Sequence, residues 1–218
     1  MDWHAWHSAY DHPDSPLEAR LRTVQERITL ALDESAPGPL RALSVCAGQG
    51  RDLLGALAGH PRRHDVTARL VELDERNVAQ ARRAAAGLGL DRVEVVRGDA
   101  AGTDLYADLA PAELVLLCGL FGNITDEDIA RTVDYCERLC ATGGTLIWTR
   151  NRKQPDRFPW ICELLEERGF ARVWLNPSDV KQGVGVHRFA GTPKPLDAGG
   201  RMFTFIGYDA MPGAGGAR

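Results

Sequence analysis

The stretch that decides the fold is Leu43-Ser44-Val45-Cys46-Ala47-Gly48-Gln49-Gly50-Arg51-Asp52-Leu53-Leu54. Small and apolar residues lead into two glycines one residue apart, and leucines then recur at helical spacing. This pattern predicts a buried strand that turns sharply into a helix. Glycine lets the backbone come close to a ligand, and the free N–H groups at the start of a helix favour polar or anionic groups. An ordinary tight turn gives the same pattern, so this stretch alone leaves both interpretations open.

A second strand is predicted at residues 66–74, and it ends in acidic side chains about 22 residues after Gly50. A carboxylate at this position can accept hydrogen bonds from ribose hydroxyls. Glu72 is the candidate for that role, with Leu73 beside it. Asp74 is expected to be the N-cap of the next helix, because the residues after it have helical character.

Strands and helices continue to alternate along the chain. Strands are predicted at residues 93–97, 113–117 and 145–149, and helices at residues 17–33, 126–139 and 160–169. Such alternation favours a parallel sheet with helices on both faces. The last segments, residues 171–175, 184–189 and 202–206, are spaced as an antiparallel hairpin or meander.

The ordered set of motifs resembles the class I S-adenosylmethionine (SAM)-dependent methyltransferases. In that family a glycine-rich first turn holds the methionine portion, an acid ending the second strand holds the ribose, and an Asp-Ala type pair meets the adenine. The matches are residues 47–50, Glu72 and Asp99-Ala100, and the resemblance covers about residues 40–150. Two positions depart from the family, which usually has an acid at Ser44 and a glycine at Cys46.

The resemblance implies a three-layer, Rossmann-like α/β fold: a seven-stranded, mostly parallel sheet with one antiparallel edge strand and helices on both faces. It also implies that the chain binds SAM and releases S-adenosylhomocysteine (SAH). The cofactor residues expected from it are Cys46, Ala47, Gly48, Gln49, Gly50, Arg51, Asp52, Glu72, Leu73, Asp99, Ala100, Cys118, Gly119 and Phe121. A dinucleotide cofactor is disfavoured, because the third glycine of that fingerprint is missing after Gly50.

The first sixteen residues are rich in aromatic side chains and histidine. Trp3, Trp6, His7 and Tyr10 fall three and four apart, so a short helix would align them on one face. We expect this segment to be a lid over the acceptor pocket, although a helix packed on the body or a protein interface remains open. His7 and Tyr10 are catalytic candidates, since histidine titrates near neutrality. Asn123 is the third catalytic candidate, although its side chain could have no role beyond closing a turn.

The net charge and the composition narrow the classes of partner that we expect the protein to bind. The net charge of −4 provides no global basic field, so a small-molecule acceptor is expected rather than nucleic acid. No long apolar run or signal peptide is recognised, and five cysteines are an odd number, so we expect a cytoplasmic protein without a membrane partner. No metal site is expected, since the cysteines and histidines lack ligand spacing.

Two further features have alternative interpretations. Residues 150–157 form one basic cluster, which could bind an anionic substrate through Arg150 or Arg152 or simply be a solvated loop. His187 falls within a predicted strand, where a structural histidine is the simpler interpretation.

The whole chain is expected to be a single domain. Residues 1–35 would form the aromatic lid and a helix packed on the core, residues 36–210 the SAM-binding domain, and residues 211–218 a flexible tail. The predicted function is methyl transfer to an O, N or C atom of a small molecule, by a monomer or homodimer. Two alternatives stay open: a SAM-binding protein that acts as a regulator or partner subunit, and a related enzyme that uses SAM for another reaction.

Overall fold

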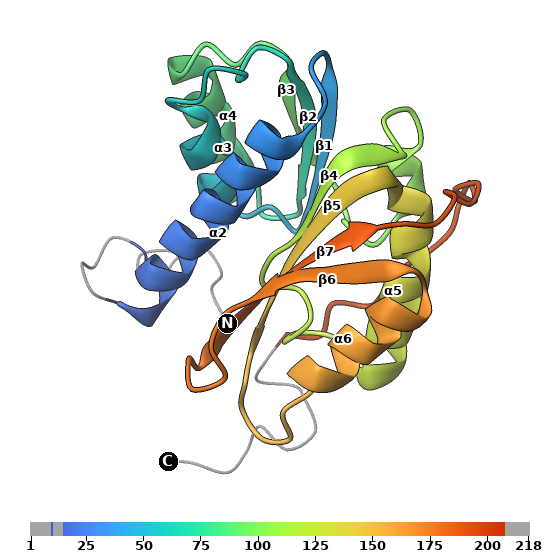
Figure 1. Ribbon diagram of the computed structural model, residues 1–218. Helices are drawn as coiled ribbons and strands as arrows, with labels where there is room; N and C mark the ends of the chain where they lie inside the picture. Colours follow the sequence, from blue (N-terminus) through green and yellow to red (C-terminus); the bar gives the residue numbers. More distant parts are fainter. Residues whose placement is uncertain (1–9, 11–14, 208–218) are drawn as a thin grey trace.

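The computed structural model describes Tyr10 and residues 15–207. Seven strands form one sheet in the order β3-β2-β1-β4-β5-β7-β6 (Figure 1). The strands are β1 (Leu40–Val45), β2 (Val66–Glu72), β3 (Val93–Arg97), β4 (Ala112–Leu117), β5 (Cys140–Asn151), β6 (Phe170–Leu175) and β7 (Gln182–Phe189). The predicted Rossmann-like methyltransferase fold class is confirmed.

The strand order reverses between β1 and β4. Strands β1 to β5 pair in parallel, whereas β7 is antiparallel to both β5 and β6. The antiparallel strand is therefore the last but one in the sheet, and β6 is the outer strand. Ligands of such sheets bind beyond the carboxyl ends of the parallel strands, near the reversal of strand order. The ends of β1 and β4 accordingly define where a site should lie.

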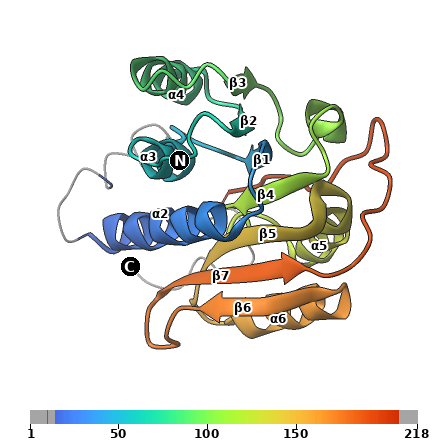
Figure 2. The same cartoon turned by 45° about the horizontal axis from the view of Figure 1, so that its top comes forward.

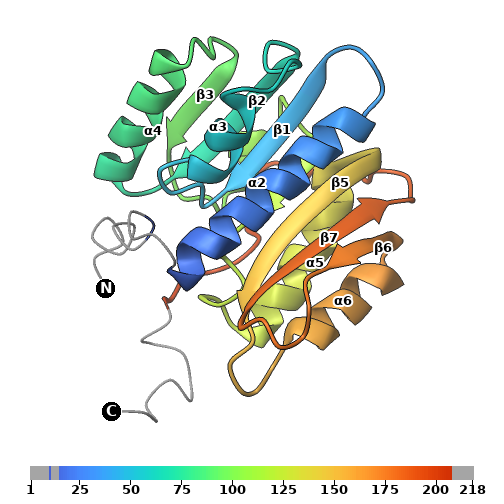
Figure 3. The same ribbon diagram turned by 60° about the vertical axis from the view of Figure 1, so that its left-hand side comes forward.

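Helices cover both faces of the sheet (Figures 2 and 3). One face carries α2 (Pro16–Glu34), α3 (Arg51–Leu57) and α4 (Glu75–Gly87), and the other carries α5 (Asp126–Leu139) and α6 (Phe158–Glu167). A short 3-10 helix, η2 (Thr103–Tyr106), follows β3. Each helical layer buries its own apolar cluster against the sheet, as expected for a parallel sheet that is buried on both faces.

Helix α2 leads from the N-terminal region to the sheet. The Ser15 side chain accepts a hydrogen bond from the Glu18 backbone N–H at 3.0 Å, and Pro16 occupies the first turn, where its missing N–H costs nothing. Val24, Ile28 and Leu32 are buried against the body. The helix packs against α3, β7 and β5, and its first turns contribute Leu17 and Arg20 to the cavity described below.

The predicted strand at residues 202–206 is wrong. Its backbone bonds to loops and helix caps instead of to a neighbouring strand: the N–H of Met202 donates to Ala101 O at 2.9 Å, and the N–H of Ile206 donates to Asn123 O at 3.0 Å. The alternating apolar residues that suggested a strand reflect the burial of Met202 and Phe203 in the core. The segment passes across the loop after β4 and reaches the cavity described below.

Helix α5 supplies a stability prediction. The Thr125 side chain caps the helix by accepting a hydrogen bond from the Asp128 N–H at 3.2 Å. Thr125→Ala is expected to cost about 1 kcal/mol of unfolding free energy, a fall of roughly 2–4 °C in Tm, measured by circular dichroism. Thr125→Ser keeps the hydroxyl and should stay close to the wild type. Equal losses in both variants would contradict the capping role.

Candidate functional site

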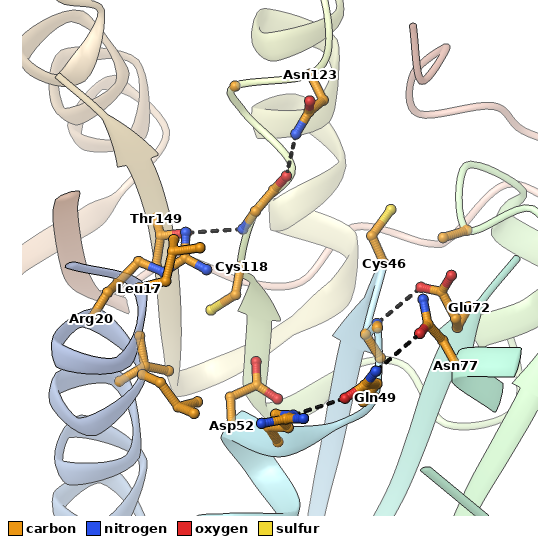
Figure 4. Close-up of a pocket in the computed structure, with 18 of the residues that line it drawn as sticks. Leu17, Arg20, Cys46, Gln49, Asp52, Glu72, Asn77, Cys118, Asn123 and Thr149 are labelled. Atoms are coloured by element: carbon orange, nitrogen blue, oxygen red, sulfur yellow. Dashed lines mark hydrogen bonds between the residues drawn. The ribbon is translucent and has the colours of Figure 1, made fainter. Parts of the chain in front are cut away.

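A cavity of about 630 Å³ opens at the carboxyl ends of β1, β2, β4 and β5 (Figure 4). Its volume falls in the range of pockets that hold small ligands and cofactors. One wall comes from the turns after β1, β2 and β3, and the opposite wall from α2, from the loop after β4 and from the end of β5. The lining residues include Tyr10, Leu17, Arg20, Cys46, Ala47, Gly48, Gln49, Arg51, Asp52, Glu72, Leu73, Asn77, Asp99, Ala100, Cys118, Gly119, Asn123, Thr149, Arg150, Phe203 and Phe205.

The turn after β1 has left-handed backbone at three positions, with φ of 55° at Cys46, 56° at Gly48 and 69° at Gly50. A Cβ on Gly50 would lie 2.7 Å from Leu70 Cδ2, so the close packing of the turn on β2 requires glycine. Gly50 therefore shapes the turn from behind and, unlike the other residues expected in this motif, does not line the cavity. Cys46, where the family has glycine, adopts the positive φ at a cost in strain that a glycine would not bear.

Glu72 ties the first two turns together. Its Oε2 accepts a hydrogen bond from the Gly48 N–H and its Oε1 accepts one from the Asp74 N–H, both at 2.9 Å (Figure 4). Each oxygen keeps a second lone pair for another donor. Asp74 caps α4 by accepting from the Arg76 N–H at 2.9 Å, as predicted. Leu73 projects beside Glu72 with 66% of its surface exposed, although it is apolar.

Asn77 is a lining residue that the sequence analysis missed. Gln49 Oε1 accepts from Arg51 Nε at 2.8 Å and from Gln80 Nε2 at 3.0 Å, and Gln49 Nε2 donates to Asn77 Oδ1 at 3.4 Å. Asn77 is fully buried, and its Nδ2 has no hydrogen-bond partner among the described residues. A buried amide N–H without a partner is costly, which suits a group that a ligand completes. Its position in the first turn after an acid-ended strand was the available signal.

Asp99 and Ala100 lie at the end of β3, where they were expected. Asp99 Oδ1 accepts from the Ala101 N–H at 3.1 Å, and its Oδ2 forms an ion pair with Arg201 at 2.9 Å. Ala100 is buried at the cavity wall. The two residues extend the wall that begins at Glu72.

The loop after β4 forms the facing wall. The Gly119 N–H donates to Thr149 Oγ1 at 2.9 Å, and Asn123 Nδ2 donates to the Gly119 carbonyl at 2.7 Å (Figure 4). Gly119 has a φ of 78°, and a Cβ there would meet no atom within 4 Å, so the absent side chain leaves space that belongs to the cavity. Asn123 closes the turn, but its Oδ1 has no partner among the described residues. It therefore has one group left to offer a ligand.

Phe121 does not fit its expected role. Its ring is fully buried and packs edge-on against Trp148, with the ring centroids 5.7 Å apart. The side chain belongs to the core beneath the loop and does not line the cavity. The aromatic side chains that reach the cavity are instead Phe203 and Phe205, from the segment mistaken for a strand.

Cys118 and Asp52 meet between the two walls, near α2. Burial raises the pKa of the Asp52 carboxyl, against the hydrogen bond that it accepts from the Leu53 N–H. Burial, reinforced by the charge of Asp52, raises the pKa of the Cys118 thiol well above its usual range, and burial also raises that of Cys46. Both thiols are therefore protonated at neutral pH, which excludes a thiolate nucleophile here.

Tyr10 and Arg20 bring the N-terminal region to the cavity. Arg20 Nη2 donates to the Tyr10 hydroxyl, and burial raises the pKa of that hydroxyl, so it stays protonated. Tyr10 lines the cavity. His7 lies outside the described residues. Among the residues that the structure describes, no group of three His, Cys, Asp or Glu could hold a metal ion, and no helix could cross a membrane.

The glycine turn, the acid at the end of β2 and the buried Asn77 amide all lie in a part of the chain that is similar to known proteins. A family model described as "Putative methyltransferase" matches residues 17–175. The chain belongs to this methyltransferase family. The matched region contains the three turns that build one wall of the cavity and the loop after β4.

One relative in sequence and several solved structures of methyltransferases also match the chain. The Escherichia coli K12 protein YnbC is 31% identical over 139 residues, which is 62% of this chain and 23% of YnbC. The chain therefore spans only about a quarter of that relative. The CurJ carbon methyltransferase has a TM-score of 0.67 at 15% identity, over 84% of this chain and 57% of CurJ. An rRNA methylase from Streptococcus thermophilus has a TM-score of 0.56 at 14% identity, over 76% and 95% of the two chains.

At these identities the likeness to solved structures shows the fold alone. Because a carbon methyltransferase and an rRNA methylase share it, the fold does not exclude a nucleic-acid acceptor. The comparisons therefore do not support the exclusion of nucleic acid that the net charge of −4 suggested.

Proposed function

We propose that this chain is a SAM-dependent methyltransferase that acts on a small-molecule acceptor. The observation that carries the proposal is Glu72, whose two oxygens are held by Gly48 and Asp74 at the cavity wall with lone pairs to spare. This arrangement suits two neighbouring ribose hydroxyls, each donating to one oxygen.

The rest of the cavity fits the same cofactor. The orphan Asn77 Nδ2 and the exposed Leu73 flank Glu72, and they suit the polar edge and flat face of an adenosine. The backbone turn of Cys46, Ala47 and Gly48 would hold the methionine portion. SAM, when bound, supplies an electrophilic methyl group on a positively charged sulfur.

The chain's own contribution to methyl transfer would be positioning. Holding a nucleophile in line with the methyl group can supply several kcal/mol without a covalent catalyst. Gly119 leaves space between the walls, and Asn123 Oδ1 can accept a hydrogen bond from an acceptor N–H or O–H. The Tyr10 hydroxyl, protonated at neutral pH, can donate one. We retain Tyr10, Asn123 and His7 as proposed catalytic residues.

We also propose a class of acceptor, a cellular compartment and a lid. The net charge of −4 favours a small molecule over RNA. The five cysteines are all free, which suits a reducing compartment such as the cytoplasm. For the lid we propose the N-terminal segment, since Tyr10 and the α2 residues Leu17 and Arg20 line the cavity.

Calorimetric titration of the protein with SAM and SAH tests the proposal. Micromolar binding of both is expected, and transfer of a radiolabelled methyl group to a compound in an acceptor screen would establish the reaction. Binding without transfer to any acceptor would favour the alternative of a SAM-dependent regulator or partner subunit. If correctly folded protein binds neither ligand, the proposal is wrong.

A further inference from the structure

Arg150 is a partly buried cation on the acceptor side of the cavity. It lies near the end of β5 and lines the cavity. Its Nη1 donates to the Phe121 carbonyl, whereas its Nε is shielded from water and has no partner among the described residues. Burial, which disfavours the charged form, lowers the pKa of the guanidinium. The carboxylates of Asp126 and Asp156 favour the charged form, but Arg150 forms no ion pair with a described residue.

The acids near Arg150 are already paired with other arginines. Asp126 forms an ion pair with Arg157 at 2.7 Å, and Asp156 forms one with Arg152 at 3.7 Å. The Arg152 guanidinium also stacks over the Phe158 ring, 3.7 Å from its centroid. Within the basic cluster, Arg152 and Arg157 therefore have counter-ions, and Arg150 has none among the described residues.

A partly buried charge that forms no ion pair is stabilised when an anion pairs with it. Asn151 and Gln182 line the cavity on the same side and carry further hydrogen-bonding groups. The acids nearest to Arg150 form their ion pairs with Arg157 and Arg152, so an anion that enters the cavity can pair with Arg150 directly.

The two walls of the cavity differ in charge. Glu72, Asp74 and Asp99 lie with Arg51 on the wall assigned to the cofactor, whereas Arg20, Arg150 and Lys153 lie on the facing wall, and Asp52 lies between the two. A cationic sulfonium suits the first wall and an anion suits the second. This asymmetry separates the two ligands by charge as well as by place.

We propose that the acceptor is a small molecule with an oxyanion, a carboxylate or a phosphate, that pairs with Arg150 in the cavity. The inference rests on the proposed function, because it names the substrate class of the same site. A planar guanidinium binds either oxyanion through several donors at once. The remainder of the acceptor would lie against Phe203, Phe205 and Leu17, which are apolar.

Three probes that share a phenyl ring test the inference: benzoate, phenyl phosphate and benzamide, the neutral isostere of benzoate. Their binding is measured by calorimetry with the wild type and with Arg150→Met, each with and without saturating SAH. Benzoate or phenyl phosphate should bind the wild type at least tenfold more tightly than benzamide, and Arg150→Met should abolish that preference. Whichever of the two anions binds more tightly identifies the oxyanion.

Arg157→Met is the matched control, since it removes an arginine that has its own counter-ion and does not line the cavity. It should keep the preference for the anion. Arg150→Gln, which keeps a donor for the Phe121 carbonyl, serves as a second variant should Arg150→Met fold poorly. Neither Arg150 variant should change the affinity for SAH, which separates this inference from the proposed function.

Thermal unfolding of the ligand-free protein adds a second readout. Removing a partly buried charge that forms no ion pair should leave the Tm of Arg150→Met equal to or above that of the wild type. The inference is overturned if the wild type does not prefer either anion to benzamide, or if the preference survives in both Arg150 variants.

Discussion

Glu72→Ala is expected to weaken SAH binding roughly a hundredfold. The carboxylate would accept two charge-assisted hydrogen bonds from ribose hydroxyls, together worth about 3 kcal/mol, or a factor near a hundred in Kd. The substitution also leaves the Gly48 and Asp74 N–H groups without their acceptor, so the turn that faces the ligand loses its anchor. Calorimetric titration of wild type and variant with SAH measures the effect.

Glu72→Gln is not a neutral replacement. Both oxygens of Glu72 already accept backbone N–H groups, so an amide would turn its NH₂ toward one of these donors. We expect a loss close to that of Glu72→Ala.

Glu75→Ala is the matched control. Glu75 is a neighbouring carboxylate that pairs with Arg97 at 2.9 Å on the surface and does not line the cavity. It should bind SAH as the wild type does. If Glu72→Ala, folded by circular dichroism, also binds like the wild type, Glu72 does not hold the ribose.

The turns of the cofactor wall could be predicted because they are local. Glycines at fixed spacing after an apolar strand, and an acid at the end of the next strand, depend on neighbours within a few residues of each other. Glu72 and Asp74 accordingly take the local positions that the sequence indicated, one at the cavity and one as a helix cap. Asn77 escaped notice because its position looked like ordinary helix.

The acceptor wall could be predicted less well, because it is assembled from distant segments. Phe121 and Phe203 are both aromatic residues outside the predicted helices. The neighbouring sequence does not indicate that Phe121 packs on Trp148 or that Phe203 reaches the cavity. Likewise, the basic cluster gave no reason to choose between Arg150 and Arg152. Only the pairing of Arg152 with Asp156 and Phe158 distinguishes them.

The same limit applies to the end of the chain. Residues 202–206 have the alternation of a strand, yet the sheet is already complete with β6 at its edge. The segment instead passes to the loop after β4, where its backbone bonds to Asn123. Apolar residues at every second position indicate that one face of the segment is buried, but they do not indicate which element covers that face.

His187 lies in the sheet interior, on β7, beside the aromatic core. It is fully buried, its Nδ1 accepts a hydrogen bond from Trp148 Nε1 at 3.2 Å, and its Nε2 has no partner among the described residues. Burial lowers the pKa of His187 to about 4, and the charge of Arg172 contributes in the same direction. The neutral ring is therefore the form that the folded protein accommodates, in agreement with a structural histidine.

The unfolding free energy should consequently depend on pH through His187. Above pH 6.5 the ring is neutral in both states, so it has no effect. Between pH 6.5 and about 4 the unfolded chain binds a proton that the folded chain does not, so stability falls as the pH falls. The slope is about 1.4 kcal/mol per pH unit, and the total loss is about 3 kcal/mol; below pH 4 both states carry the proton and the loss is constant.

His187→Asn isolates the contribution of His187 to the pH dependence of the unfolding free energy. The asparagine oxygen can still accept a hydrogen bond from Trp148 Nε1, but the side chain does not titrate. Urea unfolding of both proteins at pH 7 and at pH 4.5 gives the difference between their stabilities at each pH, in which the other titrating groups cancel. The wild type should lose at least about 2 kcal/mol relative to the variant between these values. Parallel losses in the two proteins would mean that the folded state protonates His187 as readily as the unfolded chain does, and that the Trp148 contact does not depend on the neutral ring.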